Sequence, residues 1–111
     1  MPHKKLAVVT CMDARVPVER LLGLEEGDAH VIRNAGALVT DDVLRSLELS
    51  RSLGTEEVAL VLHTDCGARQ GDLDEAAREA ATEVAGRVSQ FHGGVRGYVY
   101  DVETRDLREV R

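Results

Sequence analysis

Aromatic side chains are almost missing from this sequence of 111 residues, which has no tryptophan and only 3% aromatic residues in all. Aliphatic side chains must therefore fill the core, and the hydrophobic fraction of 43% is ordinary for a globular protein. The length is enough for one compact domain, which we expect to span residues 1–111. So small a domain leaves much of its surface unburied, and a partner subunit would help to cover it.

Positive charge and long apolar stretches are also scarce. The net charge is −6 and no cluster of lysine or arginine offsets it, which argues against a nucleic-acid surface. No apolar run is long enough to span a membrane. Only residues 6–9 form an apolar stretch after the slightly basic N-terminus, which is too short for a signal peptide. We therefore expect a cytoplasmic protein that binds neither nucleic acid nor membranes.

Cysteine occurs only twice, as Cys11 and Cys66. Cytoplasmic thiols stay reduced, so we interpret the two residues as ligands or buried thiols and not as a disulfide. His63 precedes Cys66 by three positions, and two cysteines with one histidine can hold a catalytic Zn²⁺ that keeps one coordination position open. A free cysteine is often just a small buried hydrophobic residue, but the nearby histidine favours zinc.

Two charged residues closely follow Cys11 in the sequence. On an extended segment, Asp13 and Arg15 would point to the same side, so Arg15 could hold the Asp13 carboxylate through paired hydrogen bonds. Asp13 would then stay ionised and off the metal, where it could accept the proton of a bound water. If the pair broke, Asp13 could become the fourth ligand and close the site. The alternative is a surface ion pair of little energetic value.

Hydrophobic patterning predicts alternating strands and helices. Apolar runs predict four strands, at residues 6–9, 29–32, 58–62 and 95–102. Helical signals predict three helices, namely a short one with Pro17 in its first turn, one over residues 41–53, and an alanine-rich one capped by Asp72 whose apolar stripe continues to Phe91. Residues 107–110 can return as an antiparallel edge strand. The order predicts an α/β fold of three layers, with a mostly parallel sheet of about four strands and helices on both faces.

The predicted sheet brings the two polar clusters together. In open parallel sheets, sites lie beyond the carboxyl ends of the strands. Residues 11–15 and residues 63–67 each begin just after a predicted strand, so we expect them to form one site and not two.

The helix over residues 41–53 is apolar around more than half of its circumference. A helix that touches only one sheet face needs a narrower apolar stripe. We therefore expect this helix to contact a second subunit as well. Its apolar residues are Val43, Leu44, Leu47, Leu49 and Leu53.

The sequence resembles the β-class carbonic anhydrases. The motifs that carry the resemblance are Cys11-Met12-Asp13-Ala14-Arg15, Arg33-Asn34-Ala35-Gly36, Ser46-Leu47-Glu48 and His63-Thr64-Asp65-Cys66-Gly67. In this order they are specific, whereas either metal-site motif alone would be weak. The resemblance implies that Cys11, His63 and Cys66 are zinc ligands and that Asp13 and Arg15 form the catalytic dyad.

The resemblance also implies a reaction, a substrate and an assembly. We expect a zinc lyase that reversibly hydrates CO₂ to bicarbonate and a proton through zinc-bound hydroxide, working as a homodimer or a higher homo-oligomer. Proteins of related fold hydrolyse CS₂ or COS by the same attack, and the motifs do not separate these substrates. A non-catalytic zinc- or anion-binding homologue is the other alternative. Family members usually carry an N-terminal arm and a longer insertion before the last strands, and this sequence lacks both segments.

Overall fold

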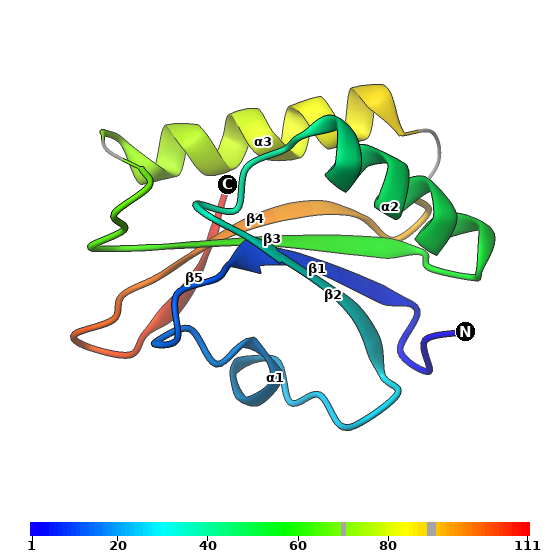
Figure 1. Ribbon diagram of the computed structural model, residues 1–111, viewed down its shortest axis with the longest axis horizontal. Helices are drawn as coiled ribbons and strands as arrows, with labels where there is room; N and C mark the ends of the chain where they lie inside the picture. The colour runs from blue at the N-terminus through cyan, green and yellow to red at the C-terminus, as the bar shows by residue number, and fades with distance from the viewer. Residues whose placement is uncertain (70, 89–90) are drawn as a thin grey trace.

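The structure, a computed structural model, describes residues 1–69, 71–88 and 91–111 (Figure 1). Its middle layer is a five-stranded sheet in the order β2-β1-β3-β4-β5. The strands are β1 (Leu6–Cys11), β2 (Ala29–Asn34), β3 (Glu57–His63), β4 (Gly94–Tyr100) and β5 (Leu107–Val110). The first four strands are parallel, and β5 pairs antiparallel with β4. The predicted α/β fold with an antiparallel edge strand is confirmed.

Helices cover both faces of this sheet, as the sequence predicts. Helix α1 (Val18–Leu21) lies on one face, whereas α2 (Asp41–Ser52) and α3 (Leu73–Arg87) lie on the other (Figure 1). Successive strand residues point to opposite faces. In β1, accordingly, Val8 packs with the α1 layer, whereas Val9 packs with the α2 and α3 layer. None of the described helices is long and apolar enough to cross a membrane.

Side-chain caps begin the two longer helices. The Thr40 hydroxyl accepts a hydrogen bond from the Val43 backbone N–H at the start of α2, and the Asp72 carboxylate accepts one from the Glu75 N–H at the start of α3. Each cap satisfies a backbone donor that has no partner inside the helix. The predicted start of the alanine-rich helix at Asp72 is therefore correct.

The end of α3 differs from the prediction. The apolar stripe predicts a helix that continues to Phe91, but α3 ends at Arg87, and Val88 is already extended, with φ −116° and ψ 115°. Residues 89 and 90 lie outside the described part of the chain. Gly86 and the β-branched Val88 both disfavour helix, which explains the earlier end. Val88 and Phe91 still pack in the core. The apolar stripe therefore predicts correctly that these residues are buried, but the prediction that they are helical is wrong.

The strand order also decides where a site can form. From β1 the chain moves outward to β2 and then returns across β1 to β3 on its other side. The connections therefore leave β1 and β3 in opposite directions, and a crevice opens at the carboxyl ends of these two strands. Cys11 is the last residue of β1, and His63 is the last residue of β3.

Candidate metal centre

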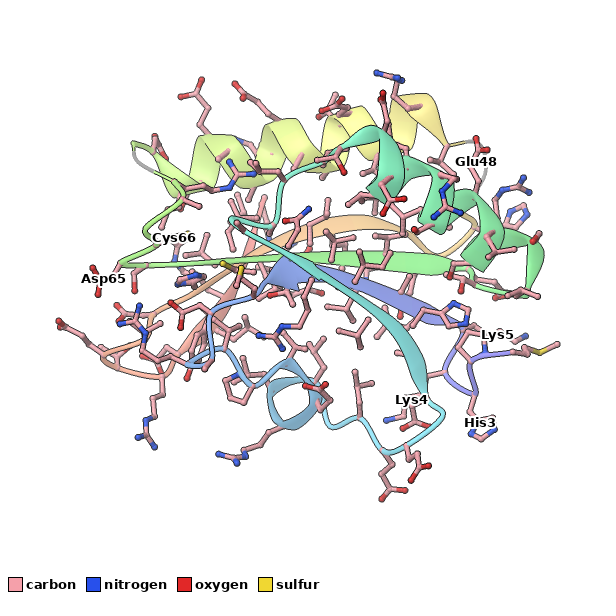
Figure 2. All side chains as sticks on the ribbon, viewed as in Figure 1. His3, Lys4, Lys5, Glu48, Asp65 and Cys66 are labelled. Carbon is pink, nitrogen blue, oxygen red and sulfur yellow. The ribbon has the colours of Figure 1, made fainter. Side chains whose placement is uncertain are left out.

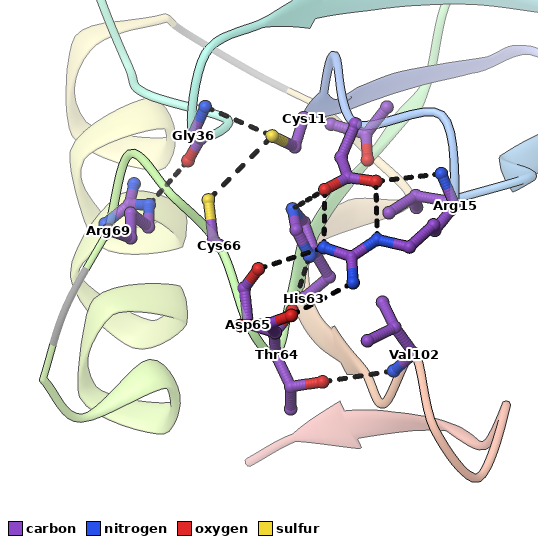
Figure 3. A network of polar contacts seen from close by, with 12 residues as sticks. Cys11, Arg15, Gly36, His63, Thr64, Asp65, Cys66, Arg69 and Val102 are labelled. Atoms are coloured by element: carbon purple, nitrogen blue, oxygen red, sulfur yellow. Dashed lines mark hydrogen bonds and ion pairs between the residues drawn. The ribbon is translucent and has the colours of Figure 1, made fainter.

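Cys11, His63 and Cys66 converge at this crevice, as the two sequence clusters predict (Figure 3). The ligand atoms of the three side chains all lie within 4.8 Å of one another. The Sγ atoms of Cys11 and Cys66 are 3.9 Å apart, and both cysteines are free of disulfides. The two clusters are thus parts of a single site.

The His63 ring presents one nitrogen to this site. Its Nδ1 lies 2.7 Å from the Thr64 carbonyl oxygen, which can only accept, so Nδ1 carries the proton and donates. The Nε2 atom therefore bears a lone pair. It is buried and has no hydrogen-bond partner in the described part of the chain. A buried nitrogen without a partner is costly, and a metal ion would satisfy it.

The spacing of the sulfur atoms fits zinc. Two thiolates bound to one tetrahedral zinc at about 2.3 Å lie about 3.8 Å apart. The observed Sγ–Sγ distance of 3.9 Å therefore needs almost no adjustment. Two thiolates and one imidazole, which would bind through its unpartnered Nε2 atom, form a set of three donors that suits Zn²⁺ with one position left open.

The environment of Cys11 favours its thiolate form. Burial raises the pKa of the thiol, but hydrogen bonds from the backbone N–H groups of Asp13 and Gly36, together with the hydrogen bond with Cys66, outweigh burial and lower the pKa from 9.0 to about 7. The Gly36 N–H lies 3.3 Å from Sγ. Gly36 has φ +90°, a conformation that a residue with a Cβ rarely adopts, and this turn aims its N–H at the sulfur.

Asp13 and Arg15 pair beside the three ligands. The Asp13 carboxylate accepts hydrogen bonds from Arg15 Nε at 3.0 Å and Nη2 at 2.8 Å. The side-chain and backbone N–H groups of Arg15 hold the pKa of Asp13 well below its usual range. Asp13 Oδ2 is 4.0 Å from His63 Nε2, so the carboxylate borders the position that a metal would occupy.

The local geometry of this pair differs from the prediction. The predicted extended segment is wrong, because β1 ends at Cys11 and residues 14–15 form a turn. The Arg15 backbone N–H donates to Asp13 Oδ1 at 2.8 Å, and this local bond folds the chain back on itself. Aspartate often closes turns in this way. The pairing was correctly predicted, but a turn produces it.

Sequence reasoning missed Asp65, which lies between the two ligands of the second cluster. Asp65 is exposed beside Cys66 at the carboxyl end of the sheet (Figure 2). Its carboxylate accepts a hydrogen bond from Arg15 Nη1 at 3.0 Å, and its backbone carbonyl accepts one from Nη2 at 3.0 Å. Asp65 has φ +53°, which aspartate tolerates better than most residues.

A second arginine supports the turn that carries Gly36. Arg69 Nε donates to the Gly36 carbonyl at 2.5 Å, and Nη2 lies 3.3 Å from the Ala37 carbonyl (Figure 3). The segment after Cys66 thus holds the turn whose N–H contacts Cys11. No signal in the sequence identifies Arg69, because it belongs to neither cluster.

Known proteins resemble the chain in both sequence and structure. A family model described as carbonic anhydrase matches residues 6–105. Beta-carbonic anhydrase 1 of Mycobacterium tuberculosis (strain H37Rv) is 43% identical over 136 aligned positions, covering 98% of this chain and 83% of that protein. A carbon disulfide hydrolase of Acidianus sp. is 47% identical over 77 positions, covering 68% of this chain and 38% of that protein.

The solved structure of a carbonic anhydrase from Streptococcus mutans superposes with a TM-score of 0.86 at 35% identity, covering 99% of this chain and 83% of that one. The alignment with the mycobacterial relative has 136 positions, more than the 111 residues of this chain. That relative therefore carries additional residues inside the matched region.

Proposed function

Because the chain belongs to the β-carbonic anhydrase family, we propose that it forms one zinc-binding domain that reversibly hydrates CO₂ to bicarbonate and a proton. The observation that carries this proposal is the convergence of Cys11, His63 and Cys66 directly beside the Asp13–Arg15 pair. Ligand donors alone would be equally consistent with a structural metal site. A carboxylate held 4.0 Å from the ligand nitrogen adds the group that a reaction with water needs.

The three ligand side chains would hold the metal, each by one atom. When bound, zinc supplies the Lewis acidity that makes water a nucleophile near neutral pH. The Thr64 carbonyl fixes the ring orientation and the tautomer of His63, so that Nε2 faces the two sulfurs. The Gly36 N–H draws electron density from the Cys11 thiolate, which would otherwise weaken the Lewis acid.

Asp13 and Arg15 would act on the attacking water. Arg15 occupies one side of the Asp13 carboxylate and keeps it ionised, because protonation would cost two charge-assisted hydrogen bonds. Asp13 Oδ2 also borders the metal position and could accept a hydrogen bond from the water, leaving an oxygen lone pair aimed at the carbon of CO₂. The turn at Asp13 and Arg15 thus orients the nucleophile.

The similarity to a carbon disulfide hydrolase supports a second candidate substrate. CS₂ and COS are linear electrophiles like CO₂, and an oriented water can attack all three at carbon. The hydrolase matches only 68% of this chain, whereas the mycobacterial carbonic anhydrase matches 98%. We therefore place CO₂ first, and an assay for sulfide release from CS₂ separates the two.

We also propose a homodimer, in which α2 contacts the second subunit. Val43, Leu44 and Leu47 are buried under α2, but Leu49 and Leu53 remain 55% and 43% exposed. They border a hollow of about 200 Å³ that also involves Ile32 of the edge strand β2. No described residue of the same chain covers this half of the broad apolar face, and a second copy would bury it.

The two free thiols at the site support a location in the cytoplasm. Cys11 and Cys66 lie 3.9 Å apart and would be exposed to oxidation whenever the metal is absent. A reducing compartment keeps such thiols available for a metal.

A stopped-flow assay of CO₂ hydration on protein loaded with one zinc per chain tests the proposed function. We expect activity in the wild type and a loss of at least about 100-fold in Asp13→Asn, which keeps the ligands and removes the carboxylate. Asp42→Asn is the matched control, because Asp42 also accepts from an arginine but lies on the exposed surface of α2. If the fully loaded wild type were inactive at every accessible pH, the enzyme proposal would be wrong.

A further inference from the structure

Arg33 extends from β2 toward the segment that follows β1. It pairs with Thr10 in the register of these parallel strands, one position before the end of the ladder at Cys11 and Asn34. Its Nε donates to the Cys11 carbonyl at 3.0 Å. Its Nη2 donates to two further carbonyls, those of Asp13 and Val16, each at 2.9 Å. One guanidinium thus binds three carbonyl groups of one short segment.

This segment contains residues with distinct tasks in the proposed site. Cys11 supplies a sulfur ligand, and Asp13 supplies the carboxylate that borders the metal position. Arg15, which holds that carboxylate, lies in the sequence between Asp13 and Val16. The carbonyls of these two residues are the ones that accept from Arg33 Nη2. The segment leaves the sheet after Cys11, where the Met12 N–H still donates to the Asn34 carbonyl of β2 at 2.8 Å, and the Arg33 side chain extends the link to β2 as far as Val16.

The geometry of guanidinium suits this task better than that of an ammonium group. A guanidinium is planar and presents its donors in a fixed fork, so bonds at Nε and Nη2 together fix its orientation. The carbonyls it binds are then fixed relative to β2. A lysine at this position would place a single charge on a flexible stem and could not hold the three carbonyls in one arrangement.

We propose that Arg33 is a positioning residue that sets the distance between the Asp13 carboxylate and the metal ligands by fixing the Cys11, Asp13 and Val16 carbonyls. The proposal rests on the proposed function for its kinetic consequence, but its structural consequence at the metal can be measured separately. Arg33 binds only backbone of this segment and is itself exposed, so its removal leaves every ligand and the dyad in the sequence.

Kinetics of Arg33→Lys and Arg33→Ala test the proposal. We expect kcat to fall by about 10- to 100-fold in both variants, the range that a misplacement of roughly 1 Å produces, with KM changed little because Arg33 binds backbone and not substrate. Free guanidinium at millimolar concentration should restore part of the kcat of Arg33→Ala and none of that of Arg33→Lys, whose side chain still fills the space.

The visible spectrum of the cobalt(II)-substituted protein gives a readout without turnover. Displacement of Cys11 and Asp13 should shift the d–d bands of Arg33→Ala, and guanidinium should shift them back. Arg87→Ala is the matched control, because Arg87 is an exposed arginine that pairs with Glu83 on its own helix α3, and it should change neither the spectrum nor kcat.

Two results would overturn the proposal. One is a kcat in Arg33→Ala and Arg33→Lys that stays within about twofold of the wild type, because a misplacement of roughly 1 Å would lower kcat by more than that. The other is an unchanged cobalt spectrum in Arg33→Ala with full metal content. An inactive wild type would instead contradict the proposed function, and the cobalt spectrum alone would then decide whether Arg33 positions the segment.

Discussion

Arg15 Nη1 donates a hydrogen bond to Asp65 Oδ2 at 3.0 Å, across 50 positions of sequence. The same guanidinium donates to Asp13 through Nε and Nη2, so the arginine of the first cluster also binds the second cluster (Figure 3). The bonds to Asp13, and then those to Asp65, raise the pKa of Arg15 above its already high ordinary value. Arg15 is therefore charged at any working pH and joins the two halves of the site.

Removal of the Asp65 carboxylate should have a small effect. In Asp65→Ala we expect kcat to fall less than about tenfold, since ion pairs between exposed side chains are weak and the bond from Nη2 to the Asp65 backbone carbonyl remains. Stopped-flow hydration of CO₂ measures this, with Asp42→Ala as a control that breaks a similar pair far from the site. A loss as large as that in Arg15→Ala would show that the carboxylate does more than hold Arg15.

Removal of the Arg15 side chain should release Asp13. Asp13 Oδ2 lies 4.0 Å from His63 Nε2 and needs only a short movement to reach a metal there. In zinc-loaded Arg15→Ala we therefore expect a larger fraction of zinc with four protein ligands, visible by X-ray absorption as scattering from the carboxylate carbon when Asp13 replaces water. Arg87→Ala, which breaks an exposed ion pair with Glu83 on α3, serves as the control. An unchanged coordination shell in Arg15→Ala would contradict the prediction that Arg15 keeps Asp13 off the metal.

The ion pair between α3 and the edge strand should make stability depend on pH. Hydrogen bonds from Arg108, one of them 2.9 Å long, hold the pKa of Asp74 below its ordinary value of 3.8. A carboxyl with a lowered folded-state pKa stabilises the fold above its ordinary pKa and loses that contribution as the pH falls through the lowered value. We expect urea unfolding to find Asp74→Asn less stable than the wild type at pH 6, and we expect this difference to shrink as the pH falls below 3.8.

Asp42→Asn is again a suitable comparison for Asp74→Asn, because its partner Arg45 lies on the same helix and the pair joins no separate elements. A difference between wild type and Asp74→Asn that stays constant from pH 6 to pH 2 would exclude ionisation of Asp74 as its cause.

A charge on the exposed part of the α2 apolar face should weaken the proposed dimer. In Leu49→Asp we expect the dissociation constant to rise by at least about tenfold, as for loss of a central apolar contact. Sedimentation equilibrium at micromolar concentration measures it. Ala85→Asp adds the same charge to an exposed position of α3 and should leave the mass unchanged. A wild-type mass equal to one chain would contradict the dimer.

Local sequence patterns predicted the elements of the fold well because each pattern has a local cause. The continuous apolar run at residues 58–62 predicts the buried strand β3, and Asp72 with the residues after it predicts the start of α3. Where two local tendencies compete, the prediction fails. The apolar stripe through Val88 and Phe91 continues beyond α3, because a side chain can be buried from an extended segment as well as from a helix.

Contacts between distant segments could not be predicted in the same way. Nothing near Asp65 in the sequence indicates Arg15, and nothing near Arg33 indicates the Cys11 and Asp13 carbonyls. These partners depend on which strands are neighbours and on how far each strand extends past the sheet. Even the Asp13–Arg15 pair was derived from an extended segment, whereas a turn forms it.

The sequence by itself determined the chemical groups of the site and their approximate place, because ligand type and strand ends are local properties. The residues in question are Cys11, Asp13, Arg15, His63 and Cys66. Tertiary structure decided how these groups are held. Only the placement of β1 beside β3 brings the sulfurs to 3.9 Å, leaves His63 Nε2 buried without a partner among the described residues, and gives Arg15 a second carboxylate. Such distances depend on the packing of whole elements, which no single segment encodes.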